Sequence, residues 1–221
     1  FDISYELEHQ IKGTSKEHYL TEIRSVITKC TFSYTRQIEM KGLGHAILCG
    51  ETLIGDQPFA VLLADDLCDA PTKGVLAQMV DLYKKYGCSI VAIEEVPKSE
   101  TNKYGVIAGN EIEPGIYMLK DMVEKPEPEV APSNLAIIGR YILTPDIFDI
   151  IRETKPGKGG EIQITDALLT QAKNGMVLAF KFEGQRFDCG SIDGFVKATN
   201  IAVEKVDELK RFFTFTFSAS P

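Results

Sequence analysis

The stretch Phe59-Ala-Val-Leu-Leu-Ala-Asp65-Asp66 runs six apolar residues into two carboxylates. Gly55 and Pro58 precede this run and Pro71 follows it, so it has the length and boundaries of a strand. An unbroken apolar run is typical of a strand buried on both faces, as in the parallel sheets of α/β proteins. Ligands of such sheets bind beyond the carboxyl ends of the strands. We therefore predict an α/β fold with Asp65 at its binding edge, where a carboxylate suits Mg²⁺.

Helical and extended patterns alternate through the first half of the chain. The predicted order is a helix after Thr14, a strand at 31–38, a helix ending at Leu53, the strand at Phe59, a helix at 72–86 and a strand at 88–93. This order is typical of a Rossmann-like, doubly wound sheet. The second half changes to antiparallel patterns, so the sheet is predicted to be mixed. Its predicted elements are a hairpin of 104–107 with 116–123, strands at 136–143 and 177–182, helices from Thr144, from Thr165 as N-cap and at 192–211, and an edge strand or apolar tail at 212–217.

Composition excludes several classes of protein. The 221 residues are 44% hydrophobic and 25% charged, which is typical of a folded domain. The net charge is −8 and no run is rich in Lys or Arg, so nucleic acid is not expected as the main partner. No apolar run reaches membrane-spanning length, and no signal peptide is visible. The five cysteines form no C-x-x-C pair, which favours reduced thiols and a cytoplasmic location.

A set of short motifs then occurs in a fixed order along the chain. They are Phe1-Asp-Ile-Ser-Tyr-Glu-Leu-Glu, Tyr34-Thr-Arg-Gln37, Lys41-Gly-Leu-Gly-His-Ala46, Leu63-Ala-Asp-Asp66, Tyr104-Gly-Val106, Val123-Glu-Lys-Pro126, Gly139-Arg-Tyr-Ile-Leu143, Gly160-Glu-Ile-Gln-Ile-Thr-Asp166 and Phe187-Asp-Cys-Gly190. In this order and spacing the set resembles the sugar-nucleotide pyrophosphorylase family. Within that family it is most similar to the bacterial UTP–glucose-1-phosphate uridylyltransferases, or UDP-glucose pyrophosphorylases. The resemblance extends to about Glu208 and implies the nucleotide-diphospho-sugar transferase type of sheet, with an antiparallel sugar-binding part.

The resemblance also implies a role for each matching residue. Gln37, by its side chain, and Gly42, by its backbone, correspond to the pair that reads the uracil edge. Asp65 corresponds to the Mg²⁺ ligand, with Asp188 as the second carboxylate. The remaining sugar-side positions are Gly105, which lines the sugar pocket, Glu124, which binds glucose hydroxyls, and Lys125, which holds the phosphate of glucose 1-phosphate. Lys125 and Asp65 are therefore the expected catalytic residues.

The activity implied is transfer of uridylyl from UTP to glucose 1-phosphate, which gives UDP-glucose and pyrophosphate by in-line attack with Mg²⁺. A single nucleotidyltransferase domain is expected over 1–211. It divides into a nucleotide-side part at 1–96, a sugar-side part at 97–191 and a C-terminal helix at 192–211, before a tail at 212–221. Neither membrane nor nucleic-acid partners are expected, and a homo-oligomer, either dimer or tetramer, is plausible.

Each of these residues also has a purely structural interpretation when taken alone. Asp65 can begin a solvated loop, Gly105 can form a bulge and Asp188 can belong to a turn. The pair Glu124-Lys125 can be a surface charge pair at a strand end. Capping or subunit packing explains Glu161, Gln163 and Asp166 as well as a role in binding does. The ordered set as a whole favours the functional interpretation.

One motif of the family does not occur in this sequence, namely the glycine-rich nucleotide loop near the start of the chain. The sequence begins with Phe1 and contains no alternative glycine-rich phosphate loop. We expect either a longer polypeptide that carries the loop, or a truncated chain without turnover. Two alternatives to the uridylyltransferase therefore stay open: a sister thymidylyl-, guanylyl- or adenylyltransferase, and a non-catalytic sugar-nucleotide-binding fragment. A Rossmann dehydrogenase is disfavoured, because no G-x-G-x-x-G follows a predicted strand.

Overall fold

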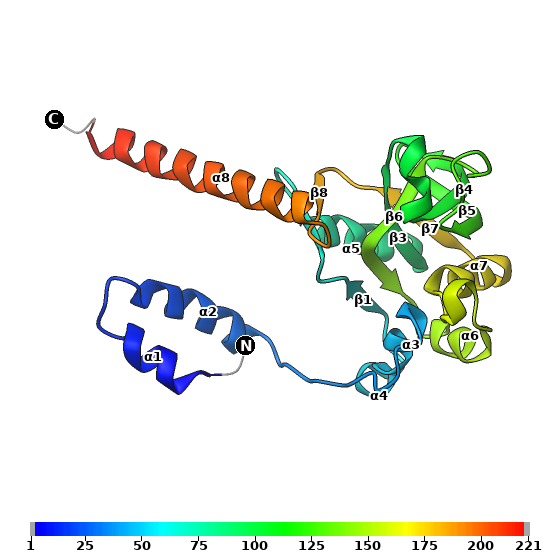
Figure 1. Ribbon diagram of the computed structural model, residues 1–221, viewed down its shortest axis with the longest axis horizontal. Coiled ribbons are helices and arrows are strands. Elements are labelled where there is room, and N and C mark those ends of the chain that lie inside the picture. The colour runs from blue at the N-terminus through cyan, green and yellow to red at the C-terminus, as the bar shows by residue number, and fades with distance from the viewer. Residues whose placement is uncertain (1–2, 219–221) are drawn as a thin grey trace. The chain divides into compact units, whose positions relative to one another are not determined.

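The computed structural model describes the backbone of residues 3–218, and it describes side chains throughout that range except at Glu22, Val26, Lys158 and 206–218. The chain forms two compact units, one before Gln37 and one from Gln37 onward. The first unit contains two helices, α1 (Tyr5–Ile11) and α2 (Glu17–Lys29) (Figure 1). An ion pair between Glu8 and Arg24 links them. The second unit contains the sheet and the helices that cover it.

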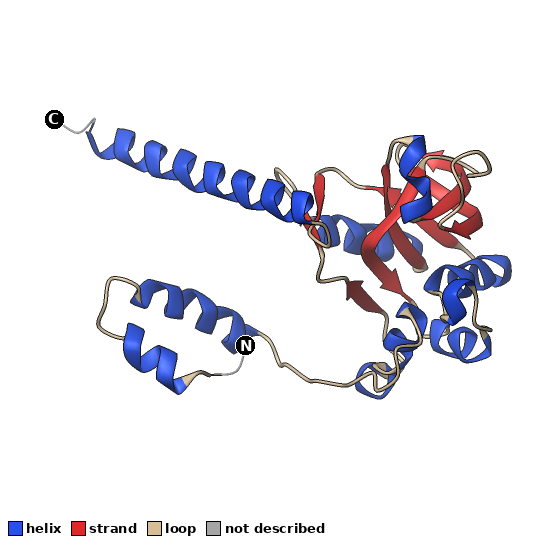
Figure 2. Cartoon of the chain, in the orientation of Figure 1, coloured by secondary structure: helices blue, strands red, loops and turns tan. Residues whose placement is uncertain are grey.

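A six-stranded mixed sheet forms the centre of the second unit (Figure 2). Its strands lie in the order β1-β6-β3-β7-β5-β4, and of the pairs described β3 with β7 is parallel and the others antiparallel. The strands are β1 (Phe59–Leu62), β3 (Ser89–Glu95), β4 (Gly105–Glu113), β5 (Ile116–Glu124), β6 (Leu135–Leu143) and β7 (Val177–Lys181). A separate antiparallel pair is formed by β2 (Asp66–Asp69) and β8 (Gln185–Asp188).

Helices cover both faces of this sheet. The helices of this unit are α3 (Leu43–Leu48), α4 (Glu51–Ile54), α5 (Val75–Tyr86), α6 (Ile147–Glu153) and α7 (Ile164–Asn174), with 3₁₀ turns at Lys98–Lys103 and Lys158–Gly160. A further helix, α8 (Ile192–Ser218), contacts β8 and extends away from the large sheet (Figure 1). Alternate residues of β3 point to opposite faces, as the pleat requires. Val91 and Ile93 pack in a cluster with residues of α6 and α7, whereas Ile90 packs with Val75 and Met79 of α5. The predicted doubly wound α/β class with a mixed sheet is therefore confirmed.

Local predictions in the middle of the chain are also confirmed. The predicted helix at 72–86 forms as α5 and ends at Gly87, whose φ of +63° is in the left-handed region that favours glycine. The predicted strand at 88–93 forms as β3, and its first five residues are buried. The predicted hairpin forms from β4 and β5, with Gly105 paired to Glu124.

The prediction that the run at Phe59 is a parallel strand buried on both faces is wrong. Among the described residues, the strand β1 lies at one edge of the sheet and pairs only with β6, in the antiparallel direction. Its residues alternate between half-buried and exposed, and Leu62 is 52% exposed. An unbroken apolar run does not specify how many strands flank it. Asp65 nevertheless follows this strand into the turn before β2, as predicted.

Three further local predictions are wrong. Residues 31–38 form no strand, and Tyr34 and Ile38 are 71% and 88% exposed, because no neighbouring strand pairs with this segment among the residues described. The backbone of 212–217 is helical within α8, so the predicted edge strand does not form. Thr165 is not the N-cap of α7, which begins at Ile164 after Gln163. Over residues 3–218, no helix combines the length and the apolar character needed to cross a membrane.

Gly139 of β6 provides a test of the packing beneath the site. A Cβ atom there would lie 2.5 Å from Asp66 Oδ2 and 2.6 Å from Leu63 Cβ. We expect Gly139→Ala to lower the free energy of unfolding by about 2 to 3 kcal/mol, because the strand and the turn must move apart. At Gly175 the nearest atom to such a Cβ is 3.9 Å away, so Gly175→Ala should change the free energy of unfolding by less than about 0.5 kcal/mol. Urea denaturation measures both variants, and equal effects would contradict the packing described.

Cys88 provides a test of burial by pH. Burial raises the pKa of its thiol to about 11. The stability contributed by the neutral thiol should be complete below the pKa of an exposed thiol and lost as the pH rises towards 11. Between pH 8 and pH 11 the unfolding free energy of the wild type should therefore fall by about 2 kcal/mol relative to Cys88→Ala. If the unfolding free energies of the two proteins changed with pH in the same way, the thiol would be accessible to water.

Candidate active site

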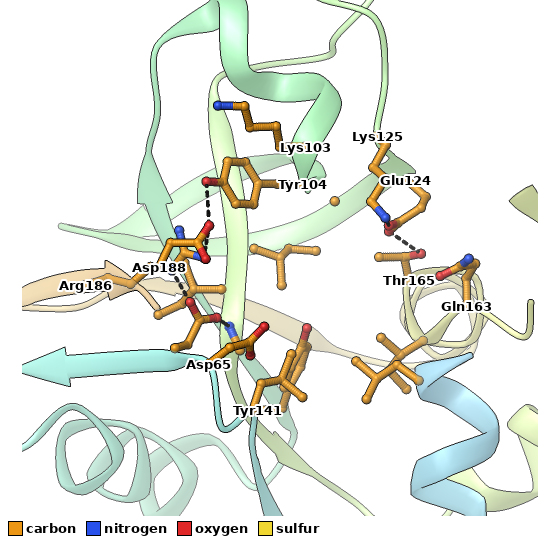
Figure 3. Close-up of a pocket in the computed structure, with 18 of the residues that line it drawn as sticks. Asp65, Lys103, Tyr104, Glu124, Lys125, Tyr141, Gln163, Thr165, Arg186 and Asp188 are labelled. Atoms are coloured by element: carbon orange, nitrogen blue, oxygen red, sulfur yellow. Dashed lines mark hydrogen bonds and ion pairs between the residues drawn. The ribbon is translucent and has the colours of Figure 1, made fainter. Parts of the chain in front are cut away.

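A cavity of about 340 Å³ opens beside the sheet where the chain leaves β1 and meets β4, β5, β6, β8 and the start of α7 (Figure 3). It brings together five of the residues predicted from the sequence. They are Asp65, Gly105, Glu124, Lys125 and Asp188. Lys103, Tyr104, Arg186 and Thr165 also line the cavity. Residues far apart in the sequence thus form one polar site.

Two carboxylates meet on one side of this cavity. A Cβ atom at Gly190 would lie 3.2 Å from Asp188 Oδ1 and 3.3 Å from Asp65 Oδ2, so both oxygens face one small space. The backbone holds them there, because Cys189 N–H donates to the carbonyl of Asp65 at 2.7 Å. Oxygen ligands of this type fit a hard divalent cation. Within the described residues, no group of three His, Cys, Asp or Glu side chains is arranged to hold a metal, so phosphate oxygens and water would complete the coordination.

Asp66 has a different role from its neighbour Asp65. Its side chain is 6% exposed and forms an ion pair with Arg186, which is 8% exposed. The other oxygen of Asp66 accepts the backbone N–H of Gly139 at 2.6 Å. Arg186 also donates to Glu94 at 2.9 Å. Asp66 therefore neutralises a buried arginine, and Asp65 is the carboxylate presented to the cavity.

Arg186 and Tyr104 together hold Asp188. A guanidinium nitrogen of Arg186 lies 3.4 Å from Asp188 Oδ2, and the Tyr104 hydroxyl donates to the same oxygen at 3.3 Å. The Tyr104 ring lies 5.0 Å from the guanidinium carbon, within cation–π range. Burial by itself would lower the pKa of Arg186, but Tyr104 and the carboxylates Asp66 and Glu94 raise it. Arg186 therefore stays charged, and Asp188 Oδ1 is left towards Asp65.

The opposite side of the cavity carries the predicted sugar-side residues (Figure 3). Glu124 accepts a hydrogen bond from the Thr165 hydroxyl at 3.1 Å, and Lys125 Nζ lies 3.7 Å from its other oxygen. A Cβ atom at Gly105 would lie 2.8 Å from Thr165 Cγ2 and 3.2 Å from Glu124 Oε2. Gly105 is thus required for the contact between Glu124 and Thr165, which is a more specific reason for glycine than a bulge.

The backbone at Lys125 is unusual. Its φ is +48°, which is uncommon for a residue other than glycine, and Pro126 follows it. The Lys125 N–H donates to the Tyr104 carbonyl at 2.9 Å, which fixes this conformation at the end of the β4–β5 pair. Strained conformations persist where the surrounding structure imposes them, often at functional sites. This bend turns the chain so that Glu124 and Lys125 both reach the cavity.

Gln37 and Gly42 do not line this cavity, but the structure brings them together beside it. Gln37 Nε2 donates to the Gly42 carbonyl at 3.0 Å. Gly42 has a φ of +89°, and a Cβ atom there would lie 2.7 Å from Glu161 Cβ. Glu161 lines the cavity, and Gln163 donates to it at 3.1 Å. The pair therefore lies against the back of one cavity wall.

Comparison with known proteins now identifies the family. The family description "Nucleotidyl transferase" matches residues 4–205. The chain belongs to the nucleotidyl transferase family. This confirms the resemblance seen in the ordered sequence motifs. Nucleotidyl transferases of this kind generally act with a divalent metal ion.

Individual relatives of this nucleotidyl transferase are similar over most of its length. It is 69% identical over 205 residues to UTP–glucose-1-phosphate uridylyltransferase of Pseudomonas aeruginosa. That alignment covers 92% of this chain and 74% of the Pseudomonas protein. A crystal structure of apo UDP-glucose pyrophosphorylase aligns with a TM-score of 0.87 and 63% identity, over 92% of this chain and 75% of that one. A structure of UDP-glucose pyrophosphorylase complexed with UDP-glucose aligns with a TM-score of 0.84 and 62% identity, over 88% and 74%.

Sequence reasoning missed three polar residues that organise the site of this nucleotidyl transferase, namely Tyr104, Thr165 and Arg186. Two of them carried a usable signal. Arg186 precedes Asp188 by two residues on β8, so strand alternation places both on one face. Tyr104 directly precedes Gly105, a predicted site residue. For Thr165 the sequence predicts only an N-cap, because its contact with Glu124 joins elements 41 positions apart.

The two neighbouring aspartates should respond differently to the same substitution. Asp66→Asn removes a carboxylate partner from the buried Arg186, so the free energy of unfolding should fall by about 3 kcal/mol. Asp65→Asn affects an exposed side chain and should change it by less than about 0.5 kcal/mol. Guanidinium denaturation at pH 7 compares the two proteins. If Asp65→Asn lowered the free energy of unfolding more than Asp66→Asn, the structural role would belong to Asp65 and not to Asp66.

Proposed function

We propose that this nucleotidyl transferase transfers uridylyl from UTP to glucose 1-phosphate and releases UDP-glucose and pyrophosphate. The relative from Pseudomonas aeruginosa, at 69% identity, carries that name. The observation that carries the proposal is the cavity itself. Two carboxylate oxygens converge on one side, and a carboxylate and an ammonium group, Glu124 and Lys125, lie on the other.

The sugar would lie at Glu124. Glucose is neutral and rich in hydroxyl donors, and an ionised carboxylate offers acceptors that suit them. Glu124 is held by Thr165, so its orientation is set before a ligand arrives. Gly105 keeps the space in front of the carboxylate clear, because any side chain there would meet both Thr165 and Glu124. Such a site favours a ligand with a hydroxyl over one that lacks it.

The phosphate of glucose 1-phosphate would pair with Lys125. Two anions must approach each other before the sugar phosphate attacks the α-phosphorus of UTP in line, and a cationic side chain lowers their repulsion. Asp65 and Asp188 would hold the divalent ion, which we propose to be Mg²⁺. When bound, that ion polarises the α-phosphate and neutralises charge on the transferred group. No covalent bond to the protein is required, since positioning supplies much of the rate.

The uracil would be read by Gln37 through its side chain and by Gly42 through its backbone. Their direct hydrogen bond supports this pairing.

The division into a nucleotide-side part at 1–96, a sugar-side part at 97–191 and a C-terminal helix stays a prediction. A homo-oligomer and a cytoplasmic location also stay predictions. The five cysteines, which form no disulfide in the described part of the chain, support a cytoplasmic location, because unbridged thiols persist in a reducing compartment.

The test is turnover in the natural protein that carries this sequence, measured as pyrophosphate release with Mg²⁺, UTP and glucose 1-phosphate. Asp65→Asn should reduce kcat by at least about a thousandfold while leaving the melting temperature near that of the wild type. Asp69→Asn is the matched control, because Asp69 lies three positions from Asp66 outside the cavity and pairs with Lys205. Its turnover should be unchanged.

Two outcomes would contradict the proposal. Full activity of Asp65→Asn would remove the metal assignment. Equal rates with UTP, dTTP, GTP and ATP in the wild type would remove the uridine specificity.

A further inference from the structure

A chain of hydrogen bonds links Gln37, Gly42 and His45 at the start of α3. Gln37 Nε2 lies 3.0 Å from the Gly42 carbonyl and 2.9 Å from His45 Nδ1. Gln37 is half-buried although Ile38, the next residue, is 88% exposed. The amide is therefore turned towards α3 and held there by two partners.

The chemistry of the two partners sets the direction of the Gln37 amide. A backbone carbonyl can only accept a hydrogen bond, so the amide nitrogen of Gln37 must face Gly42. The same nitrogen faces His45 Nδ1, which must then accept the second amide hydrogen. His45 therefore carries its proton on Nε2. Both donors of the Gln37 amide are used, and Oε1, to which none of the described residues donates a hydrogen bond, is the group left for a ligand.

We propose that His45 is a positioning residue that locks the Gln37 side chain with its oxygen towards the base, so that the site accepts a base edge with an N–H donor. This inference rests on the proposed function, in which Gln37 reads the base. His45 does not touch the base in this arrangement. It acts through Gln37 by preventing the amide from turning over.

The locked amide has a consequence for base choice. Uracil presents an N3–H donor between two carbonyl oxygens, which matches an acceptor-only side chain. Cytosine presents an unprotonated N3 acceptor at the same position, so two acceptors would face each other without a hydrogen. The Gly42 N–H, which donates to no residue that the structure describes, is available to a carbonyl of the base. A site that leaves a polar group unpaired against the wrong substrate discriminates strongly.

The neighbouring thiol competes weakly for the same nitrogen. Cys49 Sγ lies 4.0 Å from His45 Nδ1, one helical turn further along the chain. The amide contact is much shorter and joins a better donor to the ring nitrogen. Cys49→Ala is therefore a matched control, which perturbs the same histidine without touching Gln37.

The test compares kcat and KM for UTP and CTP in the wild type, His45→Leu, His45→Asn and Cys49→Ala. His45→Leu removes the acceptor, so KM for UTP should rise about tenfold and the preference for UTP over CTP should fall about tenfold, with kcat changed less than about twofold. Asn can place an acceptor oxygen near the former Nδ1, so His45→Asn should restore most of the preference. Cys49→Ala should behave as the wild type. An unchanged preference in His45→Leu would overturn the proposal.

A second measurement is independent of turnover. Nitrogen-15 NMR of the free protein should show His45 with a bare Nδ1 and a protonated Nε2, and a Gln37 amide group protected from exchange. A proton on Nδ1 at neutral pH would overturn the positioning role even if the enzyme is active. If the wild type shows no transfer at all, the proposed function fails, while the NMR result still decides whether His45 locks the amide. Should His45→Leu fail to fold, His45→Asn and the NMR measurement carry the test.

Discussion

The buried ion pair between Asp66 and Arg186 is the interaction on which the rest of the site depends. Asp66 begins β2 and Arg186 lies on β8, and these strands pair outside the main sheet. A buried arginine without carboxylate partners would be strongly destabilising. Asp66 and Glu94 supply those partners, and Asp66 also accepts the N–H of Gly139 on β6. The pair therefore links the small sheet to the large one, and Arg186 also holds Asp188 in the wall of the cavity.

The cavity carries two carboxylates on one side, and a carboxylate with an ammonium group on the other. On one side, Asp66 pairs with Arg186, and Arg186 also holds Asp188 through Oδ2. Asp188 Oδ1 and Asp65 Oδ2 then face the same space beside Gly190. On the other side, Glu124 is fixed by Thr165, and the strained backbone of Lys125 brings an ammonium group close to it. In the proposed reaction, the divalent ion and Lys125 would neutralise different phosphates of the two anionic substrates.

The segment from Lys41 to Gly44 connects Gln37 and Gly42, the proposed base-reading residues, to this cavity. Lys41 O accepts the N–H of Ile162 at 2.8 Å, and Gly44 N–H donates to the Ile162 carbonyl at 2.9 Å. Glu161, next to Ile162, lines the cavity. Glycine is needed at both positions, because a Cβ atom at Gly42 would lie 2.7 Å from Glu161 Cβ and one at Gly44 would lie 2.7 Å from the Ile162 carbonyl oxygen. Two backbone hydrogen bonds therefore join the cavity wall to the segment that carries Gly42.

The sequence by itself determined the α/β class, the β4–β5 hairpin, the helix ended by Gly87 and a family resemblance carried by ordered motifs. These features depend on local periodicity, turn chemistry and motif order, which one chain displays without its partners. Only the tertiary structure decided that β1 is an edge strand, that Asp66 and not Asp65 meets Arg186, and that Thr165 holds Glu124. Each depends on which distant segments become neighbours: Asp66 and Arg186 are 120 positions apart. Local patterns specify which face of an element is apolar, whereas the pairing of buried charges is decided by the packing of elements that no local pattern connects.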